Sequence, residues 1–250
     1  MFRILLYLLT IHCAQAQISY IPQDDWVGFN WVQVEGVLKK IEHTTNDQKL
    51  LYSLEAHYRL NNQASEYHQF ILRPMLGYRI NNTTIWMGYA HLKDTTSPLA
   101  DNESRFFQMV TYADEGNIVN SKVSFLAGLR LEQRYWTQPQ VNLTEINYRM
   151  RAMLRVAYEM FSLPTGTVNL VVANEYFYRL NSTQLTGGSK EFDQNRTQLG
   201  LEFRRLIQGA PQQLTISYMH NRYQGFTNRG VNIGAKMTIP HRSQRPPRHY

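Results

Sequence analysis

Several segments of this chain alternate between apolar and charged side chains. The clearest alternation runs through residues 123–135, where Arg130, Glu132 and Arg134 occupy every second position and apolar residues dominate the positions between them. A period of two predicts β-strands, because successive side chains of a strand point to opposite faces. A water-soluble β-protein buries its apolar face, whereas a barrel in a lipid bilayer turns that face outward and keeps polar residues inside. Arginine beside glutamate on one face therefore favours the membrane barrel.

The charged and apolar alternation is clear in five segments, and about eleven strands are expected in all, of which 26–38 is the least regular. Bacterial single-chain barrels have an even number of strands, so we expect the irregular region 17–49 to account for the odd count. The sequence predicts an all-β chain that forms a single closed antiparallel up-and-down transmembrane β-barrel of about twelve strands, with ten as the alternative. The connections 137–147 and 180–191 are expected to be long loops, and 162–166 and 206–211 short turns. The expected strands are 26–38, 50–60, 68–80, 84–92, 103–112, 122–136, 148–158, 167–179, 196–204, 214–222 and 231–239.

The N-terminus has the pattern of a secretory signal. Arg3 precedes the short apolar stretch 4–11, and Ala14-Gln15-Ala16 forms a small-x-small cleavage site. We expect residues 1–16 to be removed, 17–239 to form the barrel, and 240–250 to be a basic, proline-rich disordered tail. Cys13 is the only cysteine, so the mature chain would have no thiol.

These features predict Sec-type export and insertion into a bacterial outer membrane. No segment contains 18 consecutive apolar residues, so a membrane-spanning helix is not expected. The expected partners are the outer-membrane lipids and the barrel-assembly machinery. The formal charge is +7, but arginines share strand faces with glutamates instead of forming an exposed basic stripe, so nucleic-acid binding is not expected.

The charged faces together form the main candidate site. Buried charges must pair or stay hydrated, so two interpretations apply: an arginine-lined pore or pocket that passes or binds small anionic solutes, or an ion-pair network that fills a narrow barrel. Barrels of about eight strands enclose little more than side chains, which favours the filled barrel. The predicted lumen-facing residues are Glu55, Arg59, Arg73, Arg79, Glu103, Arg105, Arg130, Glu132, Arg134, Arg149, Arg151, Arg155, Glu175, Arg179, Arg196, Glu202 and Arg204.

Ser53, Glu55 and His57 share one face of a predicted strand and suggest a hydrolase triad. Alternate strand residues lie roughly 6–7 Å apart, whereas a base must approach its nucleophile to about 3 Å. We therefore expect no catalysis, and keep an outer-membrane enzyme acting on lipid or envelope substrates as the alternative. A soluble periplasmic ligand-binding barrel is a further alternative, disfavoured because it would expose a large apolar surface. The histidines lack metal-ligand spacing, and no metal or cofactor is expected.

The last predicted strand contains Asn232, Gly234, Met237 and Ile239 in an order typical of the C-terminal signal that barrel-assembly machinery reads. Such signals normally end the chain, so the residues after Ile239 are a departure.

Several motifs resemble one bacterial family. They are the runs Arg130–Arg134 (RLEQR), Phe192–Arg196 (FDQNR), Leu72–Arg79 (LRPMLGYR) and Glu103–Gln108 (ESRFFQ). In this order they resemble the domain-of-unknown-function family 2490, over roughly residues 26–239. The resemblance implies an outer-membrane β-barrel and implies no reaction.

Overall fold

The computed structural model describes residues 26–41, 47–61, 66–94, 102–114, 122–138, 143–182, 191–205, 212–223 and 227–239. The expected signal sequence and C-terminal tail lie outside these residues. No helix in the described part of the chain is long and apolar enough to cross a membrane. The elements are β1 (Trp26–Ile41), β2 (Gln48–Asn61), β3 (Glu66–Ile80), β4 (Thr83–Asp94), β5 (Asn102–Asp114), β6 (Val123–Gln138), β7 (Leu143–Leu163), β8 (Gly166–Arg179), β9 (Phe192–Arg204), β10 (Gln212–Tyr223) and β11 (Thr227–Ile239).

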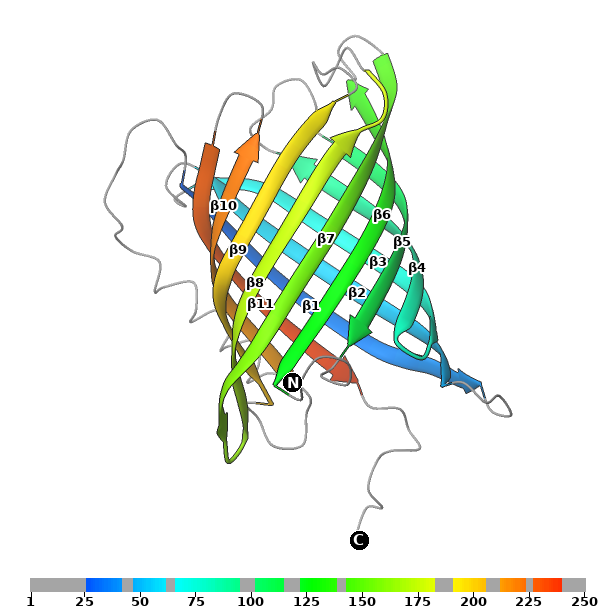
Figure 1. The fold of residues 1–250 in the computed structure, drawn as a ribbon. Helices are drawn as coiled ribbons and strands as arrows, with labels where there is room; N and C mark the ends of the chain where they lie inside the picture. The colour runs from blue at the N-terminus through cyan, green and yellow to red at the C-terminus, as the bar shows by residue number, and fades with distance from the viewer. Residues whose placement is uncertain are drawn as a thin grey trace, which may run out of the picture.

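The strands close into one barrel in which each pairs with its neighbours in the chain and β11 pairs with β1 (Figure 1). The predicted fold class, a closed all-β barrel, is confirmed. The described residues form eleven strands, between the expected twelve and ten. Of the irregular region 17–49, the described residues form β1 and the first residues of β2. Because an odd number of alternating strands cannot close with every pair antiparallel, β1 and β11 run parallel, from Trp26↔Arg229 to Gly36↔Ile239.

The parallel closure gives the barrel two distinguishable ends. β1 and β11 both run from the end that contains Trp26, here the Trp26 end, to the end that contains Ile239, here the Ile239 end. Two tight turns, Asn81–Asn82 and Pro164–Thr165, lie at the Ile239 end. Asn81 has a φ of 51°, a left-handed conformation that asparagine tolerates better than most residues.

Two strands are longer than the alternation predicted. β6 continues to Gln138 and β7 begins at Leu143, with Thr137 opposite Thr144, so the expected long loop 137–147 is wrong. β7 also extends to Leu163, past a bulge between Glu159 and Phe161. The physical reason is that ladder hydrogen bonds use backbone groups, so polar, turn-like side chains do not by themselves end a strand.

The two faces of the sheet differ sharply in exposure. Leu129 and Leu154 on the outside are 49% and 53% exposed, whereas Arg130 on the inside is 7% exposed. The interior also contains an apolar cluster on β2 to β5, which the charge alternation did not predict. Its members are Leu51, Ile71, Met75, Trp86, Ala90, Leu92 and Phe107.

Candidate functional site

The interior of the barrel contains the candidate site. The seventeen charged residues singled out from the sequence all occupy inward positions of their strands, where most are buried. They separate into groups along the barrel axis, each centred on one carboxylate. Regular strands produce this arrangement because every second residue of each strand points to the same enclosed space.

Glu103 is the centre of the group nearest the Trp26 end. Its carboxylate accepts hydrogen bonds from Arg105 (Nε, 2.5 Å; Nη2, 2.7 Å) and from Arg134 on the neighbouring strand (Nε, 2.5 Å; Nη2, 3.1 Å). Two guanidinium groups thus hold one carboxylate bidentately, the strongest geometry for such a pair. All three side chains are at most 10% exposed.

Glu132 and Asp193 form the next group. Arg149 donates from Nε (2.9 Å) and Nη2 (2.6 Å) to Glu132 and from Nη1 (3.1 Å) to Asp193. Asp193 also pairs with Arg179 at 3.1 Å. Arg149 therefore bridges β6 and β9 across the interior, and this cross-connection fills the space between non-adjacent strands.

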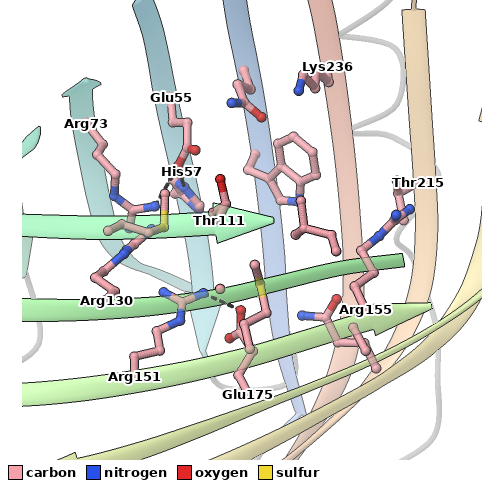
Figure 2. A pocket seen from close by; sticks show the side chains of 18 of the residues that line it. Glu55, His57, Arg73, Thr111, Arg130, Arg151, Arg155, Glu175, Thr215 and Lys236 are labelled. Carbon is pink, nitrogen blue, oxygen red and sulfur yellow. Dashed lines mark hydrogen bonds and ion pairs between the residues drawn. The ribbon is translucent and has the colours of Figure 1, made fainter. Parts of the chain in front are cut away.

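Two smaller groups lie near the middle of the barrel. Glu55 accepts a 2.6 Å hydrogen bond from Arg73 and lies 3.1 Å from Nε2 of His57. Glu175 pairs with Arg151 (Figure 2) and, at 3.2 Å, with Arg196.

The groups nearest the Ile239 end contain more exposed cations. Glu202 accepts from Arg155, Gln213 and, at 2.7 Å, Arg204, and Glu35 pairs with Lys236 at 3.0 Å across the closing strands. The Arg204 and Lys236 side chains are 36% and 29% exposed, against 8% for Arg149.

Two members of the predicted set bond to neutral groups. Arg79 donates from Nε to Thr84 (3.1 Å), and Arg59 donates to Gln69 (2.8 Å).

Three inward phenylalanines support the guanidinium groups. Phe107 lies 4.5 Å from Cζ of Arg130 and 5.8 Å from that of Arg73, measured to the ring centroid. The Cζ atoms of Arg149, Arg151 and Arg196 lie 5.0, 5.1 and 5.4 Å from the centroid of the Phe177 ring. Those of Arg59 and Arg196 lie 5.0 and 5.3 Å from the centroid of the Phe29 ring. Such contacts stabilise buried cations by roughly 0.5–2 kcal/mol each.

The Phe107 ring is held in place by a glycine. A Cβ atom on Gly88 would lie 2.2 Å from Cζ of Phe107, so only glycine allows the ring to lie flat on β4. The ring then presents its face to Arg73 and Arg130.

A cavity of about 360 Å³ occupies the middle of the barrel and its Ile239 end. On β1, β2 and β9 it also reaches Phe29, Arg59 and Arg196, in the halves of these strands nearer the Trp26 end. All eleven strands contribute to its wall, which includes Arg73, Arg130, Arg151 and Lys236 (Figure 2). The Glu103 and Glu132 carboxylates do not line it. The ion pairs of Glu103 and Glu132 therefore pack the interior beside the cavity toward the Trp26 end, and the hollow part reaches the Ile239 end.

Comparison with known proteins places the chain in a family. The family model described as "Protein of unknown function (DUF2490)" matches residues 31–232. The chain belongs to this family. An uncharacterised protein of Methylorubrum extorquens is 32% identical over 175 residues, which cover 68% of this chain and 70% of that protein. No solved structure matches. The family expected from the four motifs is thus confirmed, and its description assigns no activity.

Three charged residues of this DUF2490 interior were not predicted. Glu35 lies in the irregular first strand, and Lys236 was considered only as part of the last strand. Asp193 has the parity of an outward residue, but a bulge between Phe177 and Tyr178 changes the register so that it reaches Arg149 and Arg179. The inward phenylalanines carried a signal, because Phe107 and Phe177 continue the alternation that begins at Glu103 and Glu175.

The residues suggested as a triad are not arranged as one. Ser53 accepts a 2.9 Å hydrogen bond from Gln33, and the imidazole of His57 contacts Glu55. Glu55 in turn is bound to Arg73. His57 therefore contacts the Glu55 carboxylate, and the Ser53 hydroxyl is hydrogen-bonded to Gln33. Within the described residues no cluster of His, Cys, Asp and Glu could hold a metal ion.

The residues of the expected assembly signal lie on β11. Asn232 points inward and donates to Ser217 at 3.2 Å. Gly234 lies under the Trp31 ring, where a Cβ would approach to 2.0 Å. Met237 is half-buried, and Ile239 ends the strand with 38% exposure. Asn232 and Gly234 therefore have packing roles in the closing seam.

Proposed function

We propose that this protein is an integral outer-membrane β-barrel of structural or transport type, with a lumen that is packed at one end and hollow at the other. The observation that carries the proposal is the outer wall. Alternate residues of nearly every strand expose large apolar side chains there, among them Leu76, Met87 and Leu199 at 58%, 65% and 52%. In water such a wall would be a severe aggregation hazard, whereas in a bilayer it replaces protein–water contact with protein–lipid contact.

Aromatic residues of the outer wall gather toward both ends of the strands. Tyr89 contacts Phe106, which contacts Tyr135, at centroid distances of 5.1 and 6.0 Å toward the Trp26 end. Tyr112 stacks on Phe125 at 5.7 Å toward the Ile239 end. Aromatic girdles at the two interfaces, with an aliphatic band between them, are typical of outer-membrane barrels.

The turn lengths support one orientation. Outer-membrane barrels keep their short turns on the periplasmic side, and the two-residue turns Asn81–Asn82 and Pro164–Thr165 lie at the Ile239 end. The proposed orientation places the hollow end toward the periplasm and the Glu103 group toward the outer surface.

Cell fractionation tests the proposal. We expect the full-length protein to sediment with outer membranes, to resist extraction with alkaline carbonate, and to migrate faster on a gel when it is not boiled. The physical reason for the mobility shift is that a closed barrel resists unfolding by detergent. Recovery in the soluble periplasmic fraction would support a water-soluble ligand-binding barrel and would refute the proposal.

The packed Trp26 end predicts that the barrel is not an open channel. In planar lipid bilayers we expect no steady ion conductance from the purified protein, under conditions in which a general porin conducts. The Glu103, Glu132 and Asp193 groups cross-link the interior, and these cross-links are the reason for the expected lack of conductance. A stable conductance of porin size would show that the interior network lines a pore.

A further inference from the structure

The wall of the cavity contains an arginine whose contact with a carboxylate is long. Arg130 Nη1 lies 3.4 Å from Glu132, whose other oxygen is already held by Arg149 at 2.6 and 2.9 Å. Its Nη2 lies 3.4 Å from Sδ of Met109. The Arg130 guanidinium therefore has only one long contact with a carboxylate and one weak contact with sulfur.

Two further arginines surround the same point. Arg130 is directly opposite Arg151 in the β6–β7 ladder, and Arg73 shares the Phe107 ring with Arg130. Figure 2 shows the three guanidinium groups pointing into the cavity from one side of the wall. Like charges directly opposite on a sheet destabilise it, and an anion between them would remove that cost.

The hydrogen-bonding capacity of this cluster is not fully used. Nε of Arg73 and Nε of Arg130 are buried without a hydrogen-bond partner among the described residues. Arg73 pairs with Glu55, and Arg151 pairs with Glu175. Arg196 also forms an ion pair with Glu175. Arg151 and Arg196 thus share one carboxylate, and Arg130 has only the long contact with Glu132, which Arg149 already holds at 2.6 Å. A buried cation in such surroundings favours an anionic ligand.

The cavity wall next to the three arginines is apolar and adaptable. Met75, Trp86, Met109 and Met153 line it, and methionine side chains conform to varied ligand shapes. Gly128 leaves room among them, because a Cβ there would approach its nearest neighbours, Met153 and Thr111, only to 3.4 Å. The cavity of about 360 Å³ is within the usual range of small-molecule sites, roughly 300–1,000 Å³.

We propose that the cavity binds a small organic carboxylate with a short apolar body. Its carboxylate lies among Arg73, Arg130 and Arg151, and its body lies along Met75, Met109, Met153 and Trp86. This assignment rests on the proposed function, which supplies the hollow end of the barrel as the entrance. It deepens that function by naming the ligand class and the residues that select it.

Quenching of tryptophan fluorescence by 6-bromohexanoate tests this site, because bromine quenches indole at short range and Trp86 lines the cavity. Trp31 also lines the cavity, so the measurement uses the full-length Trp31→Phe protein in zwitterionic detergent. This protein should show saturable quenching that a further Trp86→Phe substitution largely removes. The uncharged 6-bromohexanol, which has the same body, should quench without saturation. Equal saturable quenching by the acid and the alcohol would overturn the proposal.

Arg130→Gln should weaken binding of 6-bromohexanoate by about tenfold or more, the effect of losing a charge-assisted hydrogen bond. Arg222→Gln, which changes an exposed arginine of β10, is the matched control and should bind as the unaltered protein does. Gly128→Leu should also weaken binding, because its side chain occupies the cavity while Arg130 is unchanged. Unaltered affinity in both Arg130→Gln and Gly128→Leu would refute the site.

The gel-mobility shift of unboiled samples reports folding of each variant separately from binding. A barrel that inserts into outer membranes but shows no saturable carboxylate quenching would contradict this inference and leave the proposed function intact. A protein found in the soluble fraction would contradict the proposed function itself.

Discussion

Replacing Glu103 with glutamine is expected to lower the free energy of unfolding by about 3–5 kcal/mol, the range seen when one partner of a buried ion pair is removed. Arg105 and Arg134 both bind this carboxylate bidentately and are almost fully buried. The variant leaves two adjacent cations in a dry interior without the acid that neutralises them. Urea unfolding of the barrel in lipid vesicles, followed by tryptophan fluorescence, measures the loss.

Glu159→Gln is the matched control for this experiment. Glu159 accepts a hydrogen bond from Ser162 in an exposed part of β7, so its replacement should change stability by at most ~1 kcal/mol. If Glu103→Gln were as mild as Glu159→Gln, the interior at the Trp26 end would be hydrated and the packed network would not hold the strands together.

Leu154→Arg is expected to destabilise the barrel in a bilayer by about 2–4 kcal/mol, the cost of an arginine at the bilayer midplane on a barrel's lipid face. Leu154 lies near the middle of β7 and is 53% exposed on the outer wall. The arginine would have to enter hydrocarbon or distort the bilayer to reach water. The same urea titration in vesicles measures the effect.

Leu163→Arg tests the depth dependence of that cost. Leu163 is also exposed and belongs to the same strand, but it adjoins the turn at the Ile239 end, where the expected cost is only about 0–1 kcal/mol. If both substitutions were harmless, the outer wall would face water. The proposed membrane location would then be wrong.

Much of the candidate site was predictable from the alternation alone. Where strands are regular, one inward residue determines the direction of its neighbours two positions away, which is why Arg130, Glu132 and Arg134 lie inside together. The same rule missed Asp193, because a bulge changes the register and no side-chain pattern marks it. It also gave no face to Met109, Phe107 and Trp86, which occupy inward positions.

The partners of each charge were not predictable. Glu132 is bound by Arg149, opposite it on β7, more closely than by Arg130, two residues before it on the same strand. Asp193 accepts a hydrogen bond from Arg149, although the two residues are 44 positions apart in the sequence. Such choices depend on strand register and on the curvature that brings non-adjacent strands within reach, and neither quantity is encoded in local spacing.

The amino-acid sequence by itself determined which charged side chains face inward wherever a strand is regular, because alternation is a local property of a strand. Only the tertiary structure decided the count of eleven described strands, the parallel β1–β11 seam, and the division of the interior into a packed end and a hollow end. These depend on how the whole sheet closes on itself, since closure sets the width of the interior and therefore which long side chains can meet across it.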